Sequence, residues 1–163
     1  MKIIQLDDLQ ENAVDLIANQ WMLITAGTAD NHNTMTASWG GIGHLWNKDV
    51  AYIFIRPQRH TYDFVEKNDF FSLCFFEEKY RNVLKLCGSK SGRDIDKMNL
   101  EITPVVDEQN IYYKEARVVM LCKKIYYQDL DPKNFLDASI QKNYPQNDYH
   151  RMYIGEIYKT LEN

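Results

Sequence analysis

The chain has 163 residues, in which 23 acidic side chains outnumber 19 basic ones, for a formal net charge of −4. A chain of this length buries about 70% of the surface that its unfolded form exposes, so we expect one domain spanning residues 1–163. The acidic balance argues against a general nucleic-acid binder, because the phosphate backbone selects proteins with a basic face.

Cysteine usage and hydropathy exclude further classes. The three cysteines are odd in number and show no CxxC spacing, so neither a disulfide framework nor a zinc site is indicated. No stretch approaches the roughly 20 apolar residues of a membrane span, and the first eight residues turn acidic before a signal-peptide core develops. We therefore expect a cytoplasmic protein with no membrane partner.

The first third of the chain predicts a short helix and a hairpin. Apolar spacing between Leu6 and Ala18 indicates a loose arm with one short helix. An apolar run from Trp21 to Gly27 is typical of a strand, and the polar tip 30–33 should turn the chain back into an antiparallel strand from Thr34 to about Gly40. The glycine pair at positions 40 and 41 would end or bulge that strand.

The middle of the chain predicts two strand-then-helix segments. Residues 50–55 form a β-branched and aromatic run that Pro57 stops, and a helix follows with Thr61 as its N-cap. Residues 70–76 are again typical of a strand. An amphipathic helix is expected from about Tyr80 to Cys87, with the following glycine as its C′ residue.

The last third is mostly strand. Ser91 and Asp94 resemble a capping box that opens a short helix containing Lys97. Residues 129–142, with mixed polarity, predict a loop and a short helix. Further strands are expected at 102–106, 111–113, 116–127 and 151–158, and the third of these is long enough to bend around a barrel corner.

About seven short strands with helices in the gaps, and few βαβ units, indicate a mostly β, α+β fold: an antiparallel barrel with short helical insertions. Such a barrel has little room inside, so a ligand would lie on its outer wall or between subunits. The eleven tyrosines, seven phenylalanines and three tryptophans suit a β-rich core or a planar ligand, and the core is the commoner use.

Two segments carry the most chemistry. The turn RPQRHT at 56–61 places two guanidinium groups and a hydroxyl at a helix start, where free N–H groups favour an anion. The segment TMTASWGG at 34–41 has small side chains that would let backbone groups meet a planar heterocycle, with a tryptophan beside it. A capped helix with solvated arginines, an edge strand and a core tryptophan are the alternatives.

Other candidates are weaker. Ser89, Lys90 and Ser91 could close a site from another side or form an ordinary turn. Cys87 precedes that turn, and a buried inert thiol is the simpler interpretation. His32 and His44 have no partner at metal-ligand spacing, and no GxSxG motif supports a nucleophilic triad.

Four segments in order resemble the flavin reductase-like family of FMN-binding split barrels, in the branch that includes flavoredoxin: TMTASWGG, RPQRHTYDF, CGSKSGRDIDK and YHRMYIGEI. The resemblance spans residues 21–157. It implies a split barrel, a homodimer and non-covalent FMN near the subunit interface. It also implies an isoalloxazine ring and ribityl chain lined by Thr36, Ala37, Ser38 and Trp39, and a phosphate surrounded by Arg56, Arg59, His60 and Thr61.

The same resemblance assigns the rest of the site. Ser89, Lys90 and Ser91 would lie on a loop covering the flavin, and His150 would stand on the nicotinamide side as the catalytic candidate. The family's usual Gly-Asp-His reads Asp148-Tyr149-His150 here, which weakens the expectation of direct hydride transfer from a nicotinamide.

We therefore expect an FMN-dependent oxidoreductase of the flavin reductase type, with no metal. Electrons would come from NAD(P)H or a redox-protein partner and pass to flavin or another acceptor, while the protein supplies binding and electrostatics. Two alternatives remain: a non-catalytic FMN or haem-type carrier or sensor on the same barrel, and an oxidase resembling the pyridoxamine phosphate group.

Overall fold

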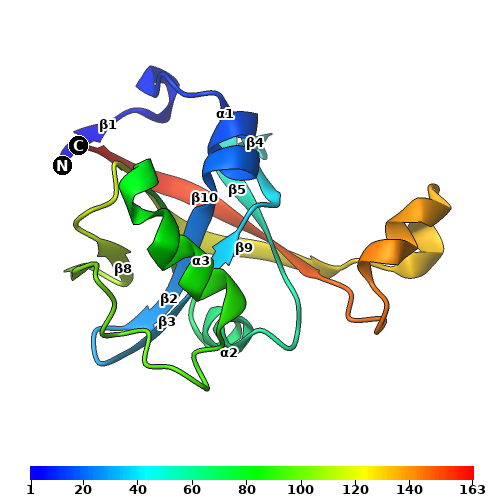
Figure 1. Ribbon diagram of the computed structural model, residues 1–163. Helices are drawn as coiled ribbons and strands as arrows, with labels where there is room; N and C mark the ends of the chain where they lie inside the picture. Colours follow the sequence, from blue (N-terminus) through cyan, green and yellow to red (C-terminus); the bar gives the residue numbers. More distant parts are fainter.

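A computed structural model describes residues 1–163, and Figure 1 shows its strands wrapped into a barrel with helices on the outside. The strands are β1 Lys2–Ile4, β2 Met22–Thr28, β3 Asn31–Ala37, β4 Gly40–Leu45, β5 Lys48–Ile55, β6 Phe70–Phe75, β7 Pro104–Asp107, β8 Asn110–Tyr113, β9 Val118–Asp129 and β10 Arg151–Glu162. The α-helices are α1 Ala13–Asp15, α2 His60–Lys67 and α3 Arg81–Ser89. Short helical turns are η1 Leu6–Asp8, η2 Leu16–Gln20, η3 Glu78–Tyr80, η4 Pro132–Asn134 and η5 Ala138–Asn143.

The main sheet is antiparallel throughout and runs in the order β3-β2-β6-β9-β10-β5-β4. Strand β1 pairs with the end of β10, so the two termini lie together (Figure 1), and β7 and β8 form a separate hairpin. The outermost strands, β3 and β4, are consecutive in the chain but do not pair with each other. The barrel is therefore open at the point where Ser38 and Trp39 cross from one edge to the other.

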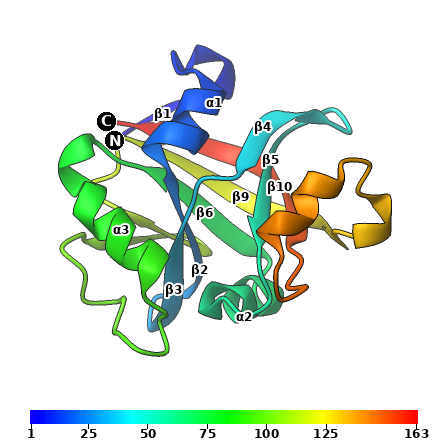
Figure 2. The same cartoon turned by 45° about the vertical axis from the view of Figure 1, so that its right-hand side comes forward.

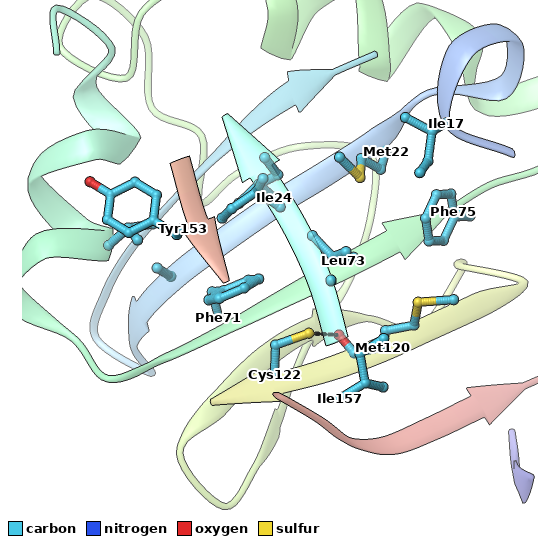
Figure 3. Packing of buried hydrophobic residues seen from close by; sticks show 14 of the residues in the cluster. Ile17, Met22, Ile24, Phe71, Leu73, Phe75, Met120, Cys122, Tyr153 and Ile157 are labelled. Carbon is cyan, nitrogen blue, oxygen red and sulfur yellow. Dashed lines mark hydrogen bonds between the residues drawn. The ribbon is translucent and has the colours of Figure 1, made fainter. Parts of the chain in front are cut away.

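The interior of the barrel is apolar, because alternate residues of each strand point inward. Figure 3 shows side chains from β2, β6, β9 and β10 converging there, among them Met22, Phe71 and Met120. At Gly155 the β9–β10 register shifts, and a Cβ on this residue would overlap the Phe71 ring. Glycine at this position lets β10 bend over the core.

Helix α3 covers the outer face of β2 and β3 (Figure 2). It buries Val83, Leu84 and Cys87 in a second apolar cluster that includes Leu23. The spacing of these residues puts them on one helical face, which explains why the sequence predicted this helix within two residues of its bounds. No helix in the structure combines the length and apolar character that crossing a bilayer requires.

The antiparallel β-rich fold was predicted, but several details were wrong. Strands β1 and β4 were not predicted. Strand β4 was missed because it is glycine-rich and its first glycines were expected to end the preceding strand. Gly88 lies inside α3 and has no positive φ, so it is not a C′ residue. The segment after Ser91 forms turns instead of a helix: the Ser91 hydroxyl accepts a hydrogen bond from the Arg93 N–H at 3.1 Å.

Candidate functional site

Two adjoining hollows lie beside the open edge of the barrel, and Arg59 lines both. The tryptophan hollow, about 200 Å³, is lined by Met35, Thr36, Ala37, Ser38, Trp39, Phe54, Arg56, Arg59 and His150. The cation hollow, about 190 Å³, is lined by Asn33, Gln58, Arg59, His60, Thr61, Ser89, Lys90, Ser91, Gly92, Asp94 and Lys97.

The tryptophan hollow forms where the chain leaves β3 and crosses to β4. The side chains there are small, and the Thr36 hydroxyl donates to the Leu84 carbonyl at 2.5 Å, so this wall is fixed to α3. Trp39 is 47% exposed, and its ring lies 5.3 Å from the His150 ring at a tilt of 51°. The hollow is thus bounded by small polar groups on one side and by aromatic rings on another.

His150 presents a neutral imidazole to the tryptophan hollow. It is 8% exposed, and its Nδ1 lies 2.9 Å from the Tyr144 hydroxyl. Burial, together with the nearby Arg56 cation, lowers the pKa of His150 to about 4. At neutral pH the ring is therefore a hydrogen-bonding group without a charge.

Arg56 lines the tryptophan hollow together with Arg59, and it does not line the cation hollow with His60 and Thr61. Its guanidinium pairs with Asp148 at 2.5 Å, donates to the Asn143 carbonyl at 2.8 Å and stands 5.1 Å from the centre of the Tyr144 ring. These contacts tie segment 130–150, which projects from the barrel in Figures 1 and 2, to the end of β5. The predicted grouping of Arg56 with Arg59, His60 and Thr61 is therefore split between the two hollows.

The cation hollow has no hydrophobic residue in its lining. Helix α2 begins at its wall, and the backbone N–H groups of His60 and Thr61 in the first turn have no partner within the helix. Arg59 donates to the carbonyls of Gly88 at 2.9 Å and Cys87 at 3.2 Å, which fixes its guanidinium between the two hollows. Lys90 adds a further cation to the lining.

Lys97 is the residue that the sequence analysis missed. It is 4% exposed, and its Nζ donates to the carbonyls of Thr34 and Cys87, both at 2.9 Å. Burial first, and the Arg59 cation second, lower its pKa to about 8. Neither Lys97 nor Arg59 pairs with a carboxylate, and both donate to backbone carbonyls. These two neighbouring cations make the hollow electrostatically suited to a negatively charged ligand, and Asp94 is the one acidic residue in the lining.

Thr61 lines the cation hollow, but the prediction that it is the N-cap of α2 was wrong. The N-cap position of α2 belongs to Arg59, and Thr61 is buried with its hydroxyl accepting from Asn33 Nδ2 at 2.7 Å. A Cβ on Gly92 would overlap the Asn33 side-chain oxygen and lie 3.0 Å from His60 Cδ2. The loop that follows α3 can therefore pack directly on Asn33 and His60 only because position 92 is glycine.

All the predicted site residues line one hollow or the other, although they come from four separate stretches of chain. The Cys87 side chain is fully buried, and burial raises the pKa of its thiol, so it does not face either hollow as a thiolate. Among the described residues, no group of three or more His, Cys, Asp or Glu side chains is arranged to hold a metal.

Comparison with known proteins shows the fold and the family. In solved structures, the chain is similar to an FMN-binding protein from Thermus thermophilus (TM-score 0.72, 15% identity, covering 100% of this chain and 82% of that one). It is also similar to flavoredoxin from Methanosarcina acetivorans (0.70, 18%, 88% and 68%). A third similar structure is the Streptomyces globisporus NADH:FAD oxidoreductase SgcE6 in complex with NAD and FAD fragments (0.66, 12%, 88% and 74%).

These identities establish a shared split-barrel fold and no more. No curated protein sequence matches the chain. The profile of the flavin reductase-like domain matches residues 14–160, which is nearly the whole chain. The chain therefore belongs to the flavin reductase-like family.

Proposed function

We propose that this protein is an FMN-dependent oxidoreductase of the flavin reductase type, which passes electrons from NAD(P)H or a redox protein to flavin or another acceptor. The family supports a flavin-related redox function. The observation that carries the proposal is the pair of adjoining hollows that share Arg59, one aromatic and the other cationic. FMN has the same two parts, a planar ring at one end and a phosphate at the other.

The donor set of the cation hollow fits a phosphate group. Arg59, Lys90 and Lys97 supply positive charge, and the first turn of α2 supplies N–H groups that face an anion favourably. Ser89 and Ser91 add hydroxyls. Each hydrogen bond from a charged donor contributes about 1.5–3 kcal/mol. Three of them together with a stacked ring would reach micromolar affinity, which requires about 8 kcal/mol after association costs.

The tryptophan hollow fits the edge of a planar ring. Small side chains at Thr36, Ala37 and Ser38 leave room for backbone groups to meet the polar rim of a heterocycle, while Trp39 and Phe54 offer apolar surface. The two volumes together fall in the range of about 300–1,000 Å³ that is usual for cofactor sites.

Bound FMN would supply the hydride and single-electron chemistry, and the protein would bind and orient it. Arg59 lines both hollows, so its charge would act on the ring as well as on the phosphate and stabilise negative charge on reduced flavin. His150 would remain a neutral hydrogen-bonding group near the flavin ring, and the hydrogen bond between Tyr144 and its Nδ1 would fix its orientation. Lys90 would add positive charge from the covering loop.

We also propose that the protein acts as a homodimer with the flavin near the interface. Trp39 and Ser38 line a further, mostly apolar hollow of about 400 Å³ together with Val14, which is 75% exposed. A second copy covering this surface would also shield one side of the tryptophan hollow. Sedimentation of the FMN-loaded protein at micromolar concentration tests this, and a monomer would contradict it.

The proposed function is tested by releasing the chromophore of the purified protein and by following NADH and NADPH consumption with added FMN. We expect released FMN, and steady consumption of at least one nicotinamide that depends on flavin. A colourless protein that refuses FMN at micromolar concentration would contradict the proposal.

A carrier is the second candidate, and the surroundings of His150 favour it. The imidazole is nearly buried against Tyr144, and Asp148 is engaged by Arg56, so the position associated with nicotinamide chemistry is held by internal contacts. Such a protein would take electrons from a redox partner. Tight FMN binding without nicotinamide turnover, together with reduction by a small redox protein, would identify the carrier.

A further inference from the structure

The cation hollow lies between two walls, and the Arg93 side chain joins them. One wall is the entry to α2, with Gln58 at its start, and the other is the loop that carries Ser91, Gly92 and Asp94. Arg93 extends from the loop to the opposite wall. Its Nη1 donates to the Gln58 carbonyl at 3.0 Å, and its Nη2 pairs with Asp63 of α2 at 2.7 Å.

The backbone of the loop around Arg93 is also held in place by hydrogen bonds. The Arg93 N–H donates to the Ser91 hydroxyl at 3.1 Å, and the next residue donates its N–H to the Ser91 carbonyl at 3.1 Å. Gly92 rests directly on Asn33 and His60, where a side chain would not fit. The packing of Gly92 and the two contacts of the Arg93 guanidinium therefore hold the loop against the start of α2, beside the hollow.

We infer that Arg93 acts as a clamp that closes the cation hollow behind one phosphate group and makes the site selective for FMN over FAD. This inference rests on the proposed function. FMN ends at its phosphate, whereas FAD continues through a second phosphate to an adenosine that must pass between the two walls. The carboxylate of Asp94 in the lining adds repulsion against a second phosphate.

The strength of the clamp sets the size of the selectivity. The side chains of Arg93 and Asp63 are 48% and 44% exposed, so their ion pair contributes little in water, and the hydrogen bond to the Gln58 carbonyl contributes more. FAD can therefore bind by opening the clamp at a moderate cost. We expect FMN to bind about tenfold more tightly than FAD, or somewhat more, which corresponds to about 1.4 kcal/mol.

The test is a titration of FMN-free protein with FMN and with FAD, followed by quenching of flavin fluorescence. Arg93→Ala should reduce the ratio of the two dissociation constants from about tenfold towards one, mainly by improving FAD binding. Arg93→Lys retains the charge and a single donor, and should give an intermediate ratio. Lys90→Ala is the matched control, because it removes a cation from the lining while leaving the clamp intact. It should weaken both flavins and preserve their ratio.

The outcomes separate this inference from the proposed function. Equal affinity of the wild-type protein for FMN and FAD would overturn the clamp and leave flavin binding in place. An Arg93→Ala variant that melts at the wild-type temperature and keeps the full FMN preference would also overturn it. If neither flavin binds to the wild-type protein, the proposed function fails and the clamp fails with it.

Discussion

Replacing Lys97 with methionine tests whether this buried cation binds the ligand or only stabilises the fold. The ammonium is 4% exposed and donates to two carbonyls, those of Thr34 and Cys87, yet it has no carboxylate partner. Methionine has a similar length and no charge, so it fills the same space without those donations. A purely structural lysine and a phosphate-binding lysine then give opposite patterns of stability and affinity.

The contacts of Lys97 give the expected change in the free energy of unfolding. Burial lowers the pKa of Lys97 from 10.5 to about 8, and at about 1.4 kcal/mol per pH unit the buried charge costs on the order of 3 kcal/mol in the FMN-free protein. Losing the two hydrogen bonds from this charged donor costs about 3–6 kcal/mol, and the Cys87 carbonyl keeps its bond from Arg59. The two contributions oppose each other. We expect the free energy of unfolding to fall by no more than about 3 kcal/mol without FMN.

The effect on FMN should be much larger. Loss of one charged donor to the phosphate removes about 1.5–3 kcal/mol of binding, so the dissociation constant should rise about 10- to 150-fold. Urea unfolding of the FMN-free protein gives the stability, and fluorescence titration gives the affinity. Arg81→Met is a control, because Arg81 also donates to backbone carbonyls but lies outside both hollows. It should lower stability and leave FMN affinity unchanged.

A Lys97→Met protein that loses several kcal/mol of stability and binds FMN as the wild type does would refute this reasoning. Lys97 would then be a structural residue, and the anion would have to be held by other groups.

Three further predictions follow from the same contacts. Arg59→Ala should weaken FMN binding tenfold or more by titration, whereas Arg56→Ala should have a smaller effect and instead increase proteolysis of segment 130–150; equal effects would contradict the split between hollows. Lys97 is neutral above its pKa of about 8, so FMN affinity should fall by up to tenfold per pH unit above that value. The free energy of unfolding of the FMN-free protein should rise between pH 8 and 10.5, because in this range Lys97 is protonated in the unfolded chain and neutral in the folded one. Both pH dependences should vanish in Lys97→Met. Gly92→Ala should push the loop away from Asn33 and lower FMN affinity at least about tenfold, and unchanged affinity in isothermal titration would show that the loop does not close the site.

The fold was predictable where the sequence pattern was local. The apolar run before Gly27, the β-branched run that ends at Ile55 and the amphipathic spacing of α3 each matched an element of the structure. Strand β4 was missed because glycine at positions 40, 41 and 43 is a weak strand former, and its place at the barrel edge is set by pairing with β5. Local propensity carries no information about such tertiary pairing.

The sequence indicated which residues are candidates for the site but not how they are arranged. Local chemistry and resemblance together pointed to Trp39, Arg59 and Lys90 as candidates, and the structure brings them to adjoining hollows. Lys97 was missed because its turn was expected to be helical, and only burial distinguishes it from a solvated lysine. Arg56 was placed with the phosphate because its partner Asp148 lies 92 residues away in the sequence.

The most direct test of the account compares FMN with riboflavin, which differ only by the phosphate. If the cation hollow grips that phosphate, the purified FMN-free protein should bind FMN at micromolar concentration or below, and riboflavin at least about tenfold more weakly. The difference should shrink in Lys97→Met. Equal binding of the two flavins, or binding of neither, would contradict the claim that the two hollows together form an FMN site.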